Sequence, residues 1–391
     1  MTPAQPLPGF SPELRTTLFY STLFMNMGAI TVYAGIWFDQ QGLTSQQIGV
    51  INALPVLMML VLNLVVGRIA DRASDWRQVI VAGALAAAIF PIGLFFTGGF
   101  WGILLFWTLA AISQAAIVPV IDAAAMRLCA RRGSNFGAMR AWGTIGYLGV
   151  ILITGYLTLW FGPAAFLPLI VGLCLLRGAI ALSLPNFRAP ADQAPPPHGA
   201  TQLLQVMKPW FLLPLVGWSA IFATHLILNA FQGLLLQRQG LGVEVIGILI
   251  ALGAATETAM FFAYRRFFST RFRARTLILA SAVVSTLRWI AMGFEPGLVP
   301  LIGLQLLHGV TYGLGFLACI SFITNWTSED IAAQAQSFFV VLQQALAVVT
   351  LAGFGWLADR YGAQAYFASA AFAATGALAI WASFRLQPPA A

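Results

Sequence analysis

The sequence contains few charged residues: Lys and Arg together number 20, and Asp and Glu number 12, in 391 residues. A charged fraction of 8%, against roughly 25% in soluble domains, excludes an ordinary soluble globular protein. Cysteine is also scarce, and Cys129, Cys174 and Cys319 lie far apart. Because no two of them have a paired spacing, the sequence indicates neither a disulfide bond nor a metal site. We expect no metal and no other cofactor.

Long apolar runs are what the sequence does contain, with hydrophobic residues making up 60% of the chain. A bilayer core of ~30 Å needs about 20 apolar residues in each helix that crosses it. The short alternating segments of a membrane β-barrel are missing. We therefore predict an all-α polytopic membrane protein with about twelve transmembrane helices. The predicted segments are residues 13–38, 47–68, 77–97, 100–127, 136–160, 163–185, 209–237, 243–264, 276–294, 298–325, 332–358 and 363–386.

Two short phrases occur twice in the sequence. Residues 41–54 read QGLTSQQIGVINAL and residues 239–252 read QGLGVEVIGILIAL. In the same way, GYLTLWFG at 155–162 is repeated as GWLADRYG at 355–362. Because both pairs have nearly the same offset, the chain is predicted to consist of two homologous halves in the same order. In a membrane protein this arrangement is typical of a transporter whose site lies near the middle of the bilayer where the halves meet.

Between the halves, NFRAPADQAPPPHGATQLLQVMK replaces the apolar pattern with proline, alanine and polar residues. Such a composition favours an extended, unpacked chain. The predicted organisation is a six-helix bundle over residues 1–185, a cytoplasmic linker over 186–208 and a second six-helix bundle over 209–391. The first residues, MTPAQPLPGFSPE, lack the basic region and cleavage pattern of a signal peptide, so we expect the first helix to be retained.

The net charge of +8 does not indicate a nucleic-acid partner, because the basic residues gather at alternate connections between predicted helices. These connections carry Arg68, Arg72, Arg77, Arg127, Arg131, Arg132, Arg188, Lys208, Arg265, Arg266, Arg271, Arg273 and Arg275, whereas Arg238 and Arg360 lie on the other side. Positively charged connections stay in the cytoplasm, which places both termini inside. We expect a monomeric, multi-pass protein of the lipid bilayer of a bacterial cytoplasmic (inner) membrane.

Several ionisable residues fall inside the predicted helices, where a charge costs ~2.5–3.5 kcal/mol on insertion scales and usually faces a partner or a cavity. Asp122 and Arg140 each lie about 7 Å inside the same membrane edge, on neighbouring antiparallel helices, and are expected to pair. The pair is either a static lock between the helices or the polar end of a cavity. For Arg177, also buried by position, the sequence suggests no partner.

Glu257, Arg288 and His308 fall near the middle of their predicted helices. A carboxylate beside an arginine gains and loses a proton as that partner moves, which is the property that a proton-coupled carrier requires. Permanent charge neutralisation is the alternative for Glu257 and Arg288. For His308, and for His225 in an earlier helix, the alternative is a neutral, hydrogen-bonded packing histidine.

Amide and hydroxyl side chains lie on the same helices and more often join helices than bind ligands, at ~0.6 kcal/mol per pair. They are Asn26, Gln114, Asn229, Gln305, Thr311, Gln343 and Gln344. Gln305, His308 and Thr311 differ from the rest, because their spacing keeps them on one helical face. Next to Tyr312, this face is predicted to form a cavity wall.

The connection between segments 47–68 and 77–97 reads GRIADRASDWR. Gly67, Asp71, Arg72 and Arg77 resemble the loop signature that the major facilitator superfamily carries at this place, although Ser74 stands where the family usually has a second glycine. The resemblance implies that Asp71 bonds neighbouring helix termini and acts as a gate latch. It also implies the superfamily's fold of two six-helix bundles.

Asp122 and Arg140, with Arg140 beginning RAWGTIGY, are similar to a region shared by lactose permease and its relatives. Tyr147 stands at the position of a sugar-stacking tryptophan in that resemblance. The likeness implies that this part of the chain contributes to a solute site.

Glu257, Arg288 in TLRWIAMG and His308 in LQLLHGVTYG match the same layout. Gln305 and Thr311 depart from it, because they replace the lysine and the glutamate that lactose permease uses in proton coupling. With these replacements the pattern resembles the phenylpropionate permease family, whose relatives carry aromatic acids, sugars and nucleosides.

Together these observations predict a secondary carrier that moves a small organic solute by proton symport and alternating access, with an aromatic or other organic acid favoured. The expected proton site is Glu257 with His308, modulated by Arg288, and Asp122 is a rival. Arg140 or Arg288 would be the counter-charge of a carboxylate. The expected solute contacts are Asn26, Arg140, Tyr147, His225, Asn229, Arg288, Gln305, Thr311 and Tyr312. Sugar or nucleoside symport and drug export are the alternatives within the same fold.

Two further classes are disfavoured. Asp71 and Asp75 have the spacing of a diphosphate–Mg²⁺ motif of membrane prenyltransferases, but the second acidic cluster of such enzymes is missing. A non-transporting sensor would normally carry an additional soluble domain. Without a nucleotide-binding motif, a primary pump is disfavoured as well. We therefore expect a transporter and not an enzyme.

Overall fold

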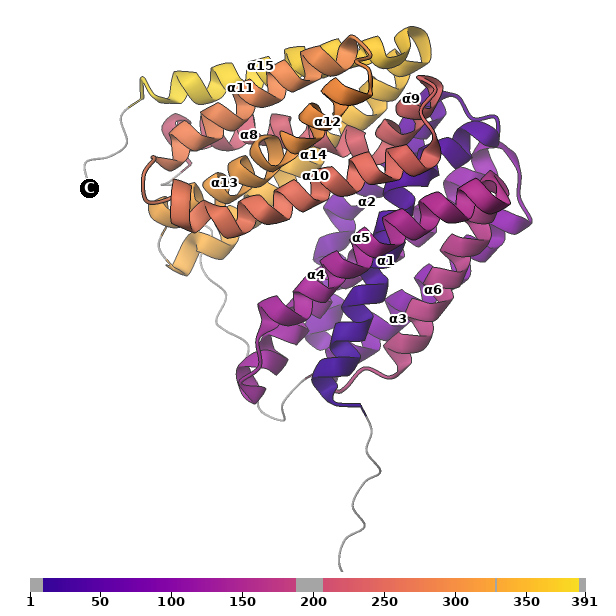
Figure 1. The fold of residues 1–391 in the computed structure, drawn as a ribbon. Helices are drawn as coiled ribbons and strands as arrows, with labels where there is room; N and C mark the ends of the chain where they lie inside the picture. Colours follow the sequence, from indigo (N-terminus) through magenta and orange to yellow (C-terminus); the bar gives the residue numbers. More distant parts are fainter. Residues whose placement is uncertain (1–9, 188–206, 328, 387–391) are drawn as a thin grey trace, which may run out of the picture. The chain divides into compact units, whose positions relative to one another are not determined.

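The computed structural model describes residues 10–187, 207–327 and 329–386, and in these residues every regular element is a helix (Figure 1). The first half of the chain contains α1 (Pro12–Gln40), α2 (Ser45–Arg72), α3 (Trp76–Ile89), η1 (Phe90–Phe95), α4 (Gly99–Arg132), α5 (Phe136–Phe161), η2 (Pro163–Ala165) and α6 (Phe166–Leu182). The second half contains α8 (Pro209–Ile227), η3 (Leu228–Gln232), α9 (Gly233–Arg238), α10 (Val243–Ala263), η4 (Tyr264–Phe268), α11 (Ala274–Gly293), α12 (Leu298–Leu306), η5 (Gly309–Leu314), α13 (Gly315–Trp326), α14 (Glu329–Tyr361), η6 (Gly362–Ala365) and α15 (Tyr366–Ser383).

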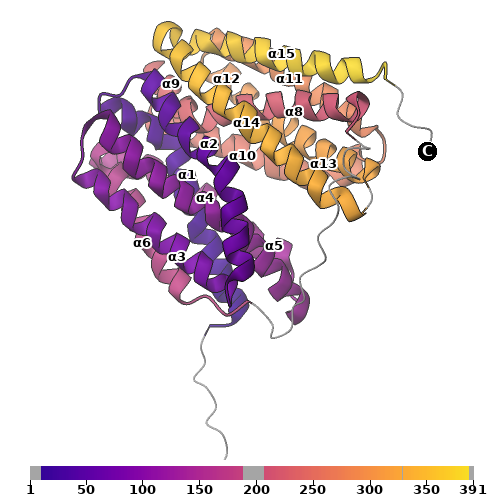
Figure 2. The same cartoon turned by 180° about the vertical axis from the view of Figure 1, so that it is seen from behind.

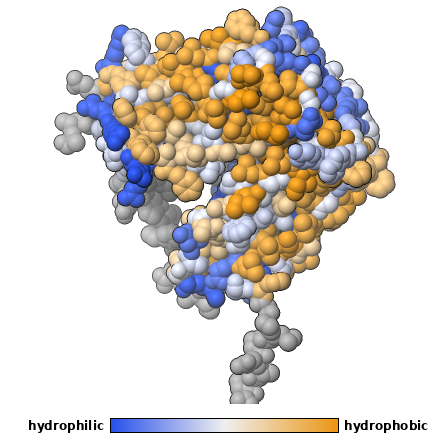
Figure 3. Space-filling view, viewed as in Figure 1, coloured by the Kyte–Doolittle hydropathy of each residue, from blue (hydrophilic) through white to orange (hydrophobic). Residues whose placement is uncertain are grey.

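Each of the predicted apolar segments coincides with one helix or with helices joined end to end, so the prediction of an all-helical polytopic fold is confirmed. Among the described residues, 10 helical stretches are long and apolar enough to cross a membrane, and one of them, Ala335–Ser383, covers the last two predicted segments. On the face drawn in Figure 3, apolar residues cover much of the surface and hydrophilic residues gather toward its edges. The cytoplasmic position of the termini stays a prediction.

Contacts between residues divide the chain into two units. The first unit comprises Met1–Ile30 and Val61–Gln193, and the second comprises Thr31–Leu60 and Ala194–Ala391. The helices α1 and α2 therefore each contribute to both units. The predicted domain boundaries at 185 and 209 stay a prediction, and most of the predicted linker (188–206) lies outside the described residues.

The first unit has its core where α1, α3 and α4 meet, with Phe19, Ile80 and Ile121 fully buried. Helix α1 also lies directly against α5. An added Cβ atom at Gly28 would lie 2.6 Å from the carbonyl oxygen of Tyr147, and one at Gly146 2.7 Å from that of Ser21. Glycine permits this approach because it has no side chain to separate the two backbones.

The start of α3 is fixed by Asp75, whose carboxylate accepts a hydrogen bond from the backbone N–H of Arg77 at 2.7 Å. The same carboxylate accepts from the N–H of Phe187, beyond the end of α6. One side chain thus caps a helix and ties down the chain that leaves the first unit.

Replacing Asp75 by Ala should lower the stability of the first unit by about 1–2 kcal/mol, because the cap and the bond to Phe187 are lost together. The measurement is the thermal unfolding midpoint of the purified protein, with Ser74→Ala, an exposed neighbour, as the control. Equal midpoints for the two variants would show that the cap contributes little.

The second unit is built around α8, which packs against α14 and α15 (Figures 1 and 2). Its Trp218 and Phe211 are fully buried. The helices α8 and α15 touch through Gly217 and Gly376, since a Cβ atom at Gly217 would lie 2.5 Å from the carbonyl oxygen of Gly376. A helix buried along most of its length in this way forms a rigid support for the polar side chains that it carries.

The segment 31–60 packs against α14 in the second unit through a pair of glycines. A Cβ atom at Gly355 would lie 2.6 Å from the carbonyl oxygen of Ser45 and 2.9 Å from the Cα atom of Gly49. Gly49 and Gly355 belong to the two repeated phrases of the sequence. Their close approach gives part of that repeat a packing role.

A Gly355→Leu change should force α2 and α14 apart and destabilise the second unit by about 1–3 kcal/mol, the usual cost of overpacking. The matched control is Gly353→Leu, since an added Cβ atom at Gly353 meets nothing within 4 Å. The thermal midpoints of both variants test this expectation, and a similar loss for both would contradict it.

Candidate functional site

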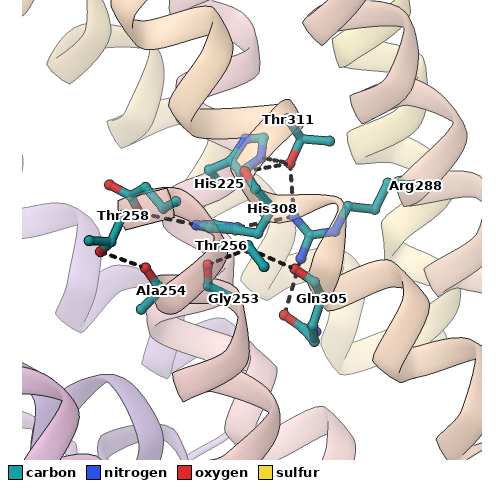
Figure 4. Close-up of polar contacts among 10 residues, drawn as sticks. His225, Gly253, Ala254, Thr256, Thr258, Arg288, Gln305, His308 and Thr311 are labelled. Carbon is teal, nitrogen blue, oxygen red and sulfur yellow. Dashed lines mark hydrogen bonds and ion pairs between the residues drawn. The ribbon is translucent and has the colours of Figure 1, made fainter. Parts of the chain in front are cut away.

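Arg288 on α11 is the centre of a polar cluster in the second unit, and its side chain is fully buried. Its Nη1 atom lies 3.1 Å from Nδ1 of His308 and 3.0 Å from Oγ1 of Thr311. Its Nη2 atom donates to Oε1 of Gln305 at 3.3 Å. The three residues predicted to share one helical face therefore meet at a single guanidinium (Figure 4).

A second set of contacts links Arg288 to His225 on α8. The Nδ1 atom of His225 lies 2.8 Å from the carbonyl oxygen of Ile221, which can only accept, so Nδ1 carries the hydrogen. Its Nε2 atom then accepts from the hydroxyl of Thr311 at 3.0 Å, and that hydroxyl accepts from Arg288. In this neutral form His225 is joined to Arg288 through the hydroxyl of Thr311, which also contacts the carbonyl oxygen of His308 at 3.4 Å.

His308 lies at the turn between α12 and η5 and has a different tautomer. Because a guanidinium only donates, Nδ1 of His308 must accept from Arg288. The hydrogen of the neutral ring is therefore on Nε2, which lies 3.4 Å from Oε2 of Glu257 on α10. Glu257, His308 and Arg288 thus contact one another in that order, with the carboxylate 26% exposed at the open end.

Close packing of α10 against the α12–η5 segment brings Glu257 to His308. A Cβ atom at Gly309 would lie 2.5 Å from the carbonyl oxygen of Thr256, the residue before Glu257. Immediately after His308 the helix widens into the π-helical turn η5. Such turns are often found at functional sites because they redirect side chains. Here the turn carries Thr311 and Tyr312.

Aromatic rings line one side of the cluster. The ring of Tyr312 is stacked on that of His308 at 5.6 Å and on that of Phe316 at 6.0 Å. On the other side, Trp289 donates through Nε1 to the hydroxyl of Thr224 and is stacked on Tyr366. The polar groups are therefore held by rings on both sides, in surroundings that exclude water from Arg288.

In the first unit the predicted pair is present: Nε of Arg140 lies 3.6 Å from Oδ1 of Asp122. Tyr20 donates its hydroxyl to the same carboxylate oxygen at 2.6 Å, and the guanidinium lies 4.1 Å above the ring of Phe24. Sequence reasoning missed both aromatic partners. Each charged side chain of the pair is about one third exposed, so both remain open to a ligand.

Three more residues were predicted to contact the solute, and each has different surroundings. Asn26 is buried and donates to Gln114 at 2.6 Å in the first unit. Tyr147 is half-buried on α5, and its carbonyl oxygen faces Gly28. Asn229 is exposed on the π-helical turn η3. The structure does not place these three residues with Arg288, and their roles stay predictions.

The residues predicted to form a gate latch lie at or near the connection between α2 and α3. Arg77 donates to the carbonyl oxygens of Leu184 and Leu182 at the end of α6, each at 2.7 Å. Arg72 is exposed, and the side chain of Asp71 and the surroundings of Gly67 lie outside the description. Asp75, which was not among the predicted latch residues, makes a further contact with the chain beyond α6, and the latch role of Asp71 stays a prediction.

A further polar cluster in the second unit joins segment 31–60 to α9 and α14, and the sequence did not reveal it. Arg238 pairs with Asp39 and donates to Oγ of Ser45 at 3.1 Å. The N–H of Ser45 donates to Asp359 at 3.1 Å. The repeated phrases, which contain Ser45 and Asp359 and begin just after Asp39 and Arg238, were the available signal.

The fold and the buried polar clusters are those of a polytopic membrane transporter. The chain belongs to the MFS_1 like family, whose model matches residues 14–369, and is thus a transporter of the major facilitator superfamily. It is 26% identical over 347 residues to the maltose permease of Geobacillus stearothermophilus, covering 88% of this chain and 87% of the relative. It is 27% identical over 353 residues to a probable 3-phenylpropionic acid transporter of Escherichia coli (strain K12), covering 86% and 89%.

Solved structures show the same fold. The nucleoside transporter NupG matches with a TM-score of 0.83 at 17% identity, covering 97% of this chain and 100% of that one. A bacterial homologue of the human lysosomal transporter Spinster, in an inward-facing and unoccupied conformation, matches with a TM-score of 0.78 at 16% identity, covering 97% and 98%. At these identities the likeness concerns the fold alone.

Proposed function

We propose that this chain is a proton-coupled secondary carrier of a small organic solute, with organic acids as the favoured class. The observation that supports the proposal is the contact chain of Glu257, His308 and Arg288 in the second unit. It joins a group that binds a proton to a group that binds a carboxylate. The relatives add support, since one of them is named a probable 3-phenylpropionic acid transporter.

The coupling follows from the tautomer of His308. While Arg288 donates to Nδ1, His308 has no lone pair for a second proton, so Glu257 is the group that carries it. A carboxylate solute that binds Arg288 bidentately would draw its N–H groups away from His308. The charge of the bound carboxylate offsets that of Arg288, so a proton on Glu257 is repelled less. Binding of the acid and binding of the proton favour each other, as symport requires.

A second solute class is favoured by different groups of the same cluster. Gln305 and Thr311 are buried, neutral hydrogen-bonding side chains of the kind that orients hydroxyl groups of a sugar or a nucleoside. The maltose permease relative supports this candidate. Under it, Arg288 would position Gln305 and Thr311 and would not contact the solute.

Thermal-shift screening of the purified chain against aromatic acids, sugars and nucleosides identifies the solute, because a ligand of the folded state raises its midpoint. Uptake into proteoliposomes then tests coupling. We expect an imposed inward proton gradient to drive accumulation of an acid such as 3-phenylpropionate, and a proton ionophore to abolish it. Uptake that is unchanged by the gradient and by the ionophore would refute proton symport.

A further inference from the structure

Arg177 on α6 is a fully buried arginine in the first unit, and it has no acidic partner among the residues that the structure describes. Its Nη1 atom donates a hydrogen bond to Oε1 of Gln114, at 2.5 Å. That oxygen also accepts from Nδ2 of Asn26 at 2.6 Å. The charge of Arg177 therefore faces neutral groups, whereas the nearby charges Asp122 and Arg140 neutralise each other.

The remaining neighbour, Cys174, supplies no negative charge either. Its Sγ atom donates to Oδ1 of Asn26 at 3.3 Å, so the thiol is a hydrogen-bond donor in this network. The Asn26 amide therefore donates through Nδ2 and accepts through Oδ1, and Oε1 of Gln114 accepts two hydrogen bonds. Each amide oxygen in this network therefore accepts a hydrogen bond, whereas N–H donors of Arg177 remain without an acceptor.

The two unused donors of Arg177 are Nε and Nη2, both shut off from solvent and without a hydrogen-bond partner. These two atoms form one edge of the planar guanidinium, with their N–H bonds parallel. That edge matches the two oxygens of a carboxylate, whereas a single spherical ion meets only one N–H squarely. Buried polar groups without partners are rare and call for an explanation.

We propose that Arg177, with Gln114 and Asn26, forms an oxyanion site in the first unit that takes a carboxylate on the Nε–Nη2 edge. The carboxylate comes either from a small free acid or from a larger solute, and the chemistry of recognition is the same. Gln114 is only half-buried on α4, so its side chain is the movable group that admits the ligand. The site does not depend on the proposed proton coupling, which involves the second unit.

The test uses the purified full chain in detergent, with chloride replaced by formate at constant ionic strength. We expect formate to raise the thermal midpoint by at least ~2 °C, because it binds the folded state. Formamide, which has the same shape without the charge, should have no effect. An unchanged midpoint on replacing chloride by formate would overturn the proposal.

Variants assign the response to Arg177. Arg177→Met should lose the formate response, and should be at least as stable as the parent without formate, since a buried charge without a counter-charge is removed. Arg360→Met, at an exposed arginine of the second unit, should keep the response, and Arg288→Met tests whether formate binds in the second unit instead. If Arg177→Met does not fold, Arg177→Gln serves in its place. A formate response that persists in the Arg177 variant, or that disappears only in Arg288→Met, would refute the assignment.

The two carboxylate sources are separated by 3-phenylpropionate and its neutral amide. A shift with 3-phenylpropionate that requires Arg177 identifies the carboxylate of a larger solute, and a shift with formate alone identifies a small free acid. Both outcomes support the site. The two proposals can be refuted separately. If uptake does not respond to the proton gradient, proton symport is refuted, and the formate response of Arg177 is still expected.

Discussion

Arg288→Lys is expected to reduce uptake of an acidic solute by at least about 30-fold, although it keeps the positive charge. Arg288 contacts His308 and Thr311 through Nη1 and Gln305 through Nη2. A lysine ammonium is a compact point charge on a flexible stem and cannot bond all of these groups in one plane or bind a carboxylate bidentately. Disrupting a buried, hydrogen-bonded charge costs about 2–5 kcal/mol, and each 1.36 kcal/mol is a factor of ten.

The measurement is initial uptake of 3-phenylpropionate into proteoliposomes, with the thermal midpoint determined on the same preparations. Arg360→Lys is the matched control, because Arg360 is exposed and its guanidinium contacts Trp356 of its own helix. We expect the Arg288 variant to remain folded while uptake falls. If Arg288→Lys retains half of the parent's uptake, the planar fork of Arg288 is not part of the transport mechanism.

Much of the fold could be predicted from the sequence because the physical signal is strong. A helix that crosses ~30 Å of hydrocarbon needs a long apolar run, and little else in a protein resembles one. The same logic found Glu257, Arg288 and His308, since a charged side chain inside such a run is costly without a reason. The i, i+3, i+6 spacing of Gln305 and Thr311 with His308 then placed all three against Arg288.

What the sequence did not predict depends on contacts between distant segments. The partner of Arg177 is an amide on α4, and amides occur along many helices, so Gln114 was noted as a polar residue but not as that partner. The π-helical turns that follow Ile227 and His308 have no simple sequence pattern. One widened turn changes the direction in which the next side chains point, but it requires no change in amino-acid composition. In the sequence, Asp75 was considered only for its spacing from Asp71. Its place just before the helix that begins at Trp76, which is typical of an N-cap residue, would have predicted its contact better.

Glu257→Gln is expected to abolish accumulation driven by an imposed proton gradient, with a loss of at least about 30-fold, while solute exchange at equal pH continues. Glutamine has the shape of a protonated glutamate and accepts from Nε2 of His308 as the carboxylate does, so the neutral state of the site is preserved. What it cannot do is release a proton. The variant therefore removes the coupled step and leaves the binding step.

The measurement compares gradient-driven uptake with counterflow of labelled 3-phenylpropionate between equal concentrations inside and outside. Asp122→Asn is the informative comparison, since Asp122 is the rival candidate for the proton and pairs with Arg140 in the first unit. If Asp122→Asn loses gradient-driven uptake and Glu257→Gln keeps it, the proton is carried in the first unit. The contact chain of the second unit would then be a fixed charge network, because a carboxylate that never changes its protonation state cannot link proton entry to the movement of Arg288.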